Sequence, residues 1–202
     1  MGALFACTPA LAQAACDDPP KLRVNWENCN KAGVDLHGAD LRVAFMRHTN
    51  LHGTNLQGAN LQGAVLWSVK LLRTNMRNAN LQGASFAGTS LQGVLLQGAN
   101  MRGINLANAN MAGVDLSGAD LTGAVLTGTR LQGANLAGGN LQYVDLSNAK
   151  LNNANLSGAK MTGAKLKNTV LIDTNLANVD LSGATWTDGT VCIPDDSIGR
   201  CL

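Results

Sequence analysis

The sequence predicts a stacked solenoid rod, because one five-residue repeat runs without interruption through residues 34–188. The central position of the repeat, first occupied by Leu36, is Leu in 24 of 31 repeats and Met in 5, while Phe86 and Trp186 fill the other two. The position two residues earlier is always small or β-branched, with Ala in 16 repeats and Thr in 7. Two recurring apolar positions in every repeat indicate one continuous core along the rod.

The five-residue period excludes both regular elements. On an α-helix, steps of five rotate the central position by about 140° each time, so no apolar stripe forms. In a flat strand, an odd period places successive central residues on opposite faces. The chain must therefore turn once in each repeat. The repeat supplies suitable residues, since Asn or Asp precedes the centre in 18 repeats and Gly follows it by two positions in 18.

Three segments show the repeat at its most regular: Ala-Asn-Leu-Gln-Gly at 59–63, Ala-Asp-Leu-Thr-Gly at 119–123 and Ala-Asn-Leu-Ala-Gly at 134–138. They resemble the pentapeptide-repeat proteins, and the resemblance extends through residues 34–188. It implies an all-β, right-handed quadrilateral β-helix with four repeats per coil. The central residue and the small residue two before it then point inward. The 31 repeats make about eight coils, and a strand spacing of about 4.8 Å gives a rod about 35–40 Å long.

Departures from the repeat divide the chain into four segments. The first is an apolar, uncharged run that ends in Ala-Gln-Ala-Ala and resembles an incomplete signal peptide, since no Lys or Arg precedes it. The second carries degenerate repeats, in which Trp26 is expected to cover the open end of the core, as Trp186 does at the other end. The expected boundaries are 1–15 for the signal peptide, 16–33 for the N-terminal cap, 34–188 for the β-helix and 189–202 for the C-terminal cap.

Four cysteines remain after the signal segment, two at each end of the rod that the resemblance implies. A disulfide needs Cα atoms within about 7 Å, which excludes pairs from opposite ends of such a rod. We therefore expect Cys16–Cys29 and Cys192–Cys201, each tying down one cap. The alternatives are free thiols or metal ligands, but pairs this far apart cannot complete one tetrahedral zinc site.

The expected compartment is the periplasm or the exterior of the cell. The signal-like segment and the paired cysteines both favour export, because disulfides persist in oxidising compartments. The alternative is a cytoplasmic protein that keeps its first residues and has reduced thiols. No stretch of the sequence is long and apolar enough to predict a transmembrane segment.

The sequence contains no motif that predicts an enzyme. The histidines, His37, His48 and His52, occupy outward positions of the first coil and are expected to decorate a solvated face. No serine lies in a nucleophile elbow, and the glycines follow the five-residue period, which implies turns rather than a phosphate-binding loop. An uninterrupted rod with flat faces offers no concave pocket. We therefore expect no catalytic residue, no cofactor and no metal.

One set of outward residues is a candidate binding patch for another protein. Stacking residues twenty apart places Phe45 under Val65 and Arg47 beside Trp67, with Leu72 around the corner. An ordinary repeat would carry polar residues in place of these apolar ones. Arg47 is able to stack on Trp67, which contributes roughly 0.5–1 kcal/mol at an exposed site. The alternative is ordinary surface variation, because single exposed apolar residues are common.

Nucleic acid is not the expected partner. Residues 34–188 carry 11 Lys or Arg and 8 Asp, scattered over all four faces without a continuous stripe. The resemblance implies a second relation to DNA, since quinolone-resistance members mimic DNA and bind gyrase through an acidic rod. This chain departs from that pattern, because its net charge is +2 and its centres are Leu rather than Phe. We expect a structural or protein-interaction rod. The alternative is a cytosolic modulator of gyrase or another topoisomerase, and self-association end to end or side by side stays open.

Overall fold

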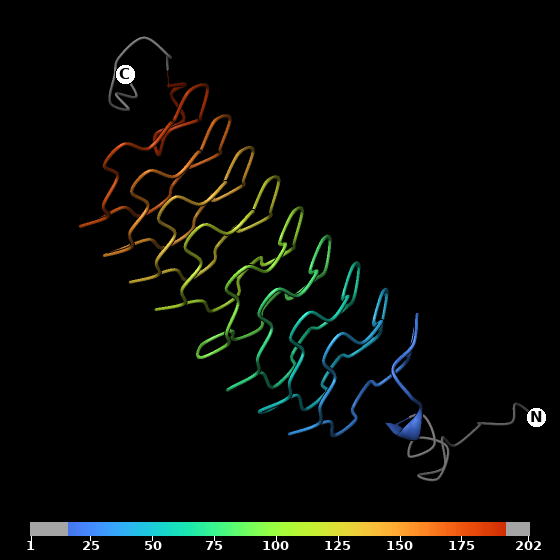
Figure 1. Cartoon of the computed structure of the whole chain (residues 1–202). Helices are drawn as coiled ribbons and strands as arrows, with labels where there is room; N and C mark the ends of the chain where they lie inside the picture. Colours follow the sequence, from blue (N-terminus) through green and yellow to red (C-terminus); the bar gives the residue numbers. More distant parts are fainter. Residues whose placement is uncertain (1–15, 193–202) are drawn as a thin grey trace, which may run out of the picture.

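The computed structural model describes residues 16–192 and shows a rod of stacked coils, coloured in order from blue to red along its axis (Figure 1). Cys16–Asp17 is helical, and the repeats that follow are built from single-residue β-bridges and turns. Within the described residues, no helix has the length and apolar character that crossing a bilayer requires.

Parallel β-bridges join residues twenty apart along the rod. The first joins Asn25 to Phe45, and the last joins Lys165 to Thr185. The chain therefore passes through four pentapeptides before it returns to the same side of the rod, one coil further along. This twenty-residue spacing makes the fold a repeat β-solenoid with four sides.

Each side of a coil ends in a tight turn. In the turn that follows Leu36, the N–H of Ala39 donates a 3.1 Å hydrogen bond to the Leu36 carbonyl oxygen, and Gly38 has a φ of 64°. All 33 equivalent positions from 23 to 183 have positive φ; 19 are Gly, and 7 of the other 14 are Asn. Positive φ at the third residue of a turn favours Gly and then Asn. The glycines of the repeat therefore meet a backbone requirement.

Asn and Asp support the turn from the position before the centre. The Oδ1 atom of Asn55 accepts a 3.2 Å hydrogen bond from the N–H of Gln57, two residues later. All 20 Asn and Asp residues at this position between residues 25 and 180 make the same Asx turn. The Nδ2 atom of Asn55 also donates to Asp35 Oδ1 at 2.9 Å, so these side chains link successive coils.

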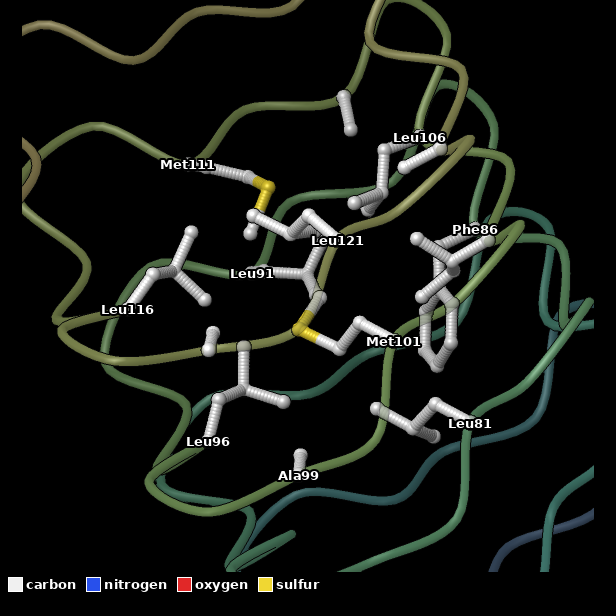
Figure 2. Packing of buried hydrophobic residues seen from close by; sticks show 14 of the residues in the cluster. Leu81, Phe86, Leu91, Leu96, Ala99, Met101, Leu106, Met111, Leu116 and Leu121 are labelled. Carbon is white, nitrogen blue, oxygen red and sulfur yellow. The ribbon is translucent and has the colours of Figure 1, made fainter. Parts of the chain in front are cut away.

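The core consists of the two inward positions of each repeat. Every central residue from 36 to 166 is buried, and Figure 2 shows Phe86, Met101 and Met111 among the side chains that fill the coil. The buried threonines satisfy their hydroxyl groups within the core. Thr49 Oγ1, for example, donates a 2.6 Å hydrogen bond to the carbonyl oxygen of Trp26 in the preceding coil. A threonine hydroxyl at an inward position is therefore tolerated, because a backbone carbonyl oxygen of the preceding coil accepts its hydrogen bond.

Near the N-terminal end of the rod, Trp26 is fully buried. Its indole N–H donates a 3.2 Å hydrogen bond to the Asp18 carbonyl oxygen, and Lys31 Nζ lies 4.1 Å from the ring centroid. The predicted disulfide between Cys16 and Cys29 is confirmed, with Cα atoms 5.4 Å apart. This bond ties the helical residues to the first coil.

At the other end, the core side chains Leu171, Leu176 and Trp186 are only partly buried. The chain then reverses, and the N–H of Cys192 donates a 2.8 Å hydrogen bond to the Ala184 carbonyl oxygen. The predicted signal peptide, Cys201 and most of the predicted C-terminal cap lie outside the described residues. The Cys192–Cys201 disulfide and the signal peptide therefore stay predictions.

Candidate protein-interaction surface

Trp67 is an exposed aromatic residue whose ring makes two side-chain contacts. The guanidinium carbon of Arg47 lies 4.7 Å from the centroid of its ring, and its indole N–H donates a 2.6 Å hydrogen bond to Ser85 Oγ. The Nε atom of Arg47 lies 3.6 Å from Glu27 Oε1. The indole nevertheless remains 42% exposed. A ring held in this way loses little conformational freedom when it contacts a partner.

The other apolar residues of the predicted patch are Phe45, Val65 and Leu72. Phe45 and Val65 are joined by a parallel bridge on one side of the rod, so their side chains are neighbours. Phe45 is 36% exposed, and Leu72, around the corner, is 54% exposed. We call Phe45, Arg47, Val65, Trp67 and Leu72 the Phe45–Leu72 patch.

The expectation that a flat-sided rod offers no concave pocket is wrong, because the structure has a groove on its surface. It has a volume of about 580 Å³, and Leu72 belongs both to its lining and to the Phe45–Leu72 patch. The groove is lined by Asn50, His52, Val69, Lys70, Leu71, Leu72, Ser90 and Gln92. Leu72 is therefore shared by the groove and the predicted patch.

The groove lies where two coils separate. Bridges join Val65 to Ser85 and Asn75 to Leu95, but within the described residues no bridge joins Lys70 to Ser90 between them. The N–H of Leu71 accordingly makes no hydrogen bond to the Ser90 carbonyl oxygen, although the equivalent bonds one coil below and one coil above measure 2.9 and 2.8 Å. Neither Lys70 nor Ser90 can make the Asx turn that Asn and Asp make elsewhere on this side.

A second, smaller opening follows on the next side of the rod. Within the described residues no bridge joins Leu95 to Asp115, and Leu95 is the one residue other than Asn or Asp in its column from 35 to 175. A depression of about 270 Å³ lies nearby. Its charged residues, Arg102 and Asp120, pair with each other at 3.1 Å. This opening therefore offers no unpaired charge to a partner.

The coils that carry the patch and the groove are positively charged. Residues 41–114 contain no Asp or Glu and six basic residues: Arg42, Arg47, Lys70, Arg73, Arg77 and Arg102. Three of the six pair with acidic residues outside this stretch. Lys70 and Arg73 are exposed and make no ion pair within residues 16–192. The surface around the groove therefore attracts anionic groups.

The histidines and carboxylates do not form a cluster of metal ligands in the described residues. His52 lines the groove, whereas His37 and His48 lie on other parts of the surface. Among residues 16–192, no three His, Cys, Asp or Glu side chains are grouped as metal ligands would be. The pKa of Asp115 is lowered, chiefly because its carboxylate accepts a hydrogen bond from the backbone N–H of Ser117. A hydrogen bond from the Ser117 side chain lowers it further. Such carboxylates stabilise turns.

A family model described as pentapeptide repeats matches five segments that together span residues 29–185. The chain belongs to the pentapeptide repeat family. The matched segments are 29–67, 59–98, 89–128, 129–168 and 152–185. The assignment rests on this match and on the twenty-residue bridges of the structure. No curated protein matches this pentapeptide repeat protein in sequence.

Solved structures of other pentapeptide repeat proteins are similar to this one. HetL from the cyanobacterium Nostoc sp. strain PCC 7120, involved in heterocyst differentiation regulation, is 26% identical; the match covers 90% of this chain and 97% of HetL, with a TM-score of 0.39. A trypsin-treated form of QnrB1, a plasmid-mediated fluoroquinolone resistance protein, is 16% identical, with coverage of 74% and 76% and a TM-score of 0.49. Rfr23 from the cyanobacterium Cyanothece 51142 is 24% identical, with coverage of 78% and 90% and a TM-score of 0.23.

Proposed function

We propose that this protein is a non-enzymatic interaction rod and that its Phe45–Leu72 patch contacts another protein. The observation that carries the proposal is the fixed, exposed indole of Trp67, held between Arg47 and Ser85. Trp and Arg are enriched among the residues that dominate binding energy at protein interfaces. Phe45 and Leu72 extend the apolar area around this anchor.

The architecture supports a scaffold rather than a catalyst. We take the rod to be a right-handed quadrilateral β-helix of about eight coils with disulfide-tied caps. Membership of the pentapeptide repeat family and the regular sides of the coils support this assignment. Rigid sides position exposed side chains for recognition without loops that must be ordered first.

A photo-crosslinking experiment tests the contact. A photoreactive phenylalanine analogue is introduced at Leu72, with Ile172 as the matched control, because Ile172 lies in the same column of turn residues and is 61% exposed. We expect a discrete crosslinked protein from the Leu72 position in cells of the natural host, weakened by Trp67→Ala, and none from the Ile172 position. Equal crosslinking from both positions would show that the patch is not a specific contact surface.

We further propose that the protein is exported to the periplasm or secreted. The Cys16–Cys29 disulfide supports this, because such bonds are rare in the cytosol. The test is the intact mass, without reduction, of the protein from fractionated host cells. We expect a periplasmic or secreted product that lacks residues through about Ala14 or Ala15 and has oxidised cysteines. A full-length cytosolic product with free thiols would contradict export.

The alternative is a cytosolic modulator of gyrase or another topoisomerase. DNA mimicry requires an acidic surface, whereas residues 41–114 contain no acidic residue. Titrating the protein into a gyrase supercoiling assay separates the two functions. We expect no inhibition and no protection of gyrase, and inhibition at stoichiometric protein would replace our proposal with this alternative.

A further inference from the structure

We propose that the groove beside Leu72 binds an acidic segment of the partner protein that carries apolar side chains. The inference rests on the proposed function, because the groove shares Leu72 with the Phe45–Leu72 patch. Three features of the groove define the chemistry of its occupant: its apolar lining, its unpaired backbone groups and its charge.

The lining accommodates a medium-sized apolar side chain. Val69 and Leu71 are almost fully buried, so they expose only small apolar areas to the groove, and Leu72 adds a largely exposed one. A volume of about 580 Å³ is within the range of pockets that bury most of a small ligand. A Leu or Phe side chain from the partner would remove this apolar area from water.

The separated coils present backbone groups that elsewhere in the rod are paired. The N–H of Leu71 and the carbonyl oxygen of Ser90 do not reach each other, although equivalent groups bond in the adjacent coils. Backbone groups withdrawn from water need partners, and exposed ones are templates for an added peptide chain. An extended segment along the groove can supply a carbonyl oxygen to the first group and an N–H to the second.

The charge of the groove selects an acidic occupant. Lys70 lines the groove and makes no ion pair within residues 16–192. No acidic residue occurs in residues 41–114, so the surrounding coils would repel a basic segment. Carboxylates of the partner would raise the association rate and exclude basic competitors.

A peptide fits these features better than a nucleic acid. One face of the Trp67 ring is covered by Arg47, so at most one face is open to a base, whereas a single strand stacks successive bases on several aromatic rings. The basic residues also fail to follow a backbone, because Ser90 and Asn110 come after Lys70 in its column.

Fluorescence anisotropy with defined peptides tests the inference. The probes are labelled peptides of about ten residues, long enough to span a groove as an extended strand. One panel combines Glu with Leu and Phe, and two matched panels replace every Glu by Gln or by Lys. We expect only the acidic panel to bind the full-length protein, and Lys70→Gln to weaken binding about fivefold, as loss of one exposed charge pair would.

Charge reversal provides the decisive comparison. Lys70→Glu should weaken binding of the acidic panel more than Lys70→Gln does, whereas Lys150→Glu, at an exposed lysine in the same column, should leave it unchanged. Equal binding of the Gln or Lys panel, or no effect of Lys70→Glu, would overturn the inference. Binding of a single-stranded oligonucleotide in place of the acidic panel would overturn it in favour of nucleic acid. If Leu72 crosslinks to a protein in cells and Lys70→Glu does not reduce this, the proposed function stands and the acidic segment does not.

Discussion

The ring of Tyr143 lies against Gly163, the residue directly above it in the next coil. A Cβ atom built on Gly163 would stand 2.7 Å from Tyr143 Cδ1, which is closer than real Cβ atoms approach. Gly158 has the same φ of 67°, but a Cβ atom there would meet nothing within 4 Å. Both positions therefore require a residue that adopts positive φ, but only Gly163 must also lack a side chain because of a neighbouring ring.

Gly163→Ala should destabilise the protein more than Gly158→Ala. Both variants place Ala in the left-handed region, at a cost of roughly 1–2 kcal/mol. Gly163→Ala must also displace the Tyr143 ring, which adds about 1 kcal/mol. Urea unfolding of both variants measures the difference, and it should vanish when both are remade with Tyr143→Ala. A difference that survives this change would exclude the ring contact as its cause.

Leu95→Asn should stabilise the rod. Asn at this position can make the Asx turn and can bond to Asn75 below and Asp115 above, for a gain of roughly 0.5–1.5 kcal/mol. Hydrogen exchange at the Leu96 amide measures closure of the ladder, since this N–H makes no inter-coil bond at present. Val125→Asn is the control, because its bridges are already formed on both sides. Unchanged protection of the Leu96 amide from exchange would show that Leu95 is not the cause of the missing bridge between these two coils.

Asp115 should make the protein more stable above pH 4 than below it. Hydrogen bonds from Ser117 lower the pKa of Asp115 in the folded protein. Its stabilisation is therefore fully present above the unfolded value of about 3.9 and is lost as the pH falls through the lower folded value. The free energy of unfolding of Asp115→Asn, compared with wild type from neutral to acidic pH, measures the effect. Asn keeps the turn, so the variant should lose less stability in acid, and an identical pH profile would contradict the assignment.

Truncation of the Phe45–Leu72 patch should leave the fold intact. Trp67→Ala and Val65→Ala remove side chains from the surface, so each should change the free energy of unfolding by less than about 1 kcal/mol. Phe86→Ala, in the fully buried core, should cost about 3–5 kcal/mol. Thermal unfolding of the three variants makes the comparison. Collapse of the Trp67 variant would place this side chain in the core and contradict the twenty-residue register.

The sequence predicted what depends on the repeat. The period requires one turn in each repeat, and the family resemblance implies four repeats per coil. The inward positions and the neighbouring positions of Arg47 and Trp67 follow from that register. The Cys16–Cys29 bond follows from two cysteines lying at the same end of the implied rod. The groove could not be predicted from the sequence, because it depends on how far two coils separate at Lys70 and Ser90. The sequence holds a weak signal, since five of the seven positions before the centre from 65 to 95 lack Asn or Asp. The same loss at 160 and 165 leaves the bridges on both sides intact, so the signal does not predict an opening by itself.

Hydroxyl-radical footprinting of the native protein tests the central claim, that the Phe45–Leu72 patch is a contact surface, most directly. Oxidation of Trp67 is compared between the purified protein and the protein in envelope fractions of its own host. Tyr143 serves as the internal reference, because it is 65% exposed and distant in sequence from the patch. We expect Trp67 to be protected several-fold in the native fraction while Tyr143 is oxidised equally in both. Equal oxidation of Trp67 in the two samples would contradict the account.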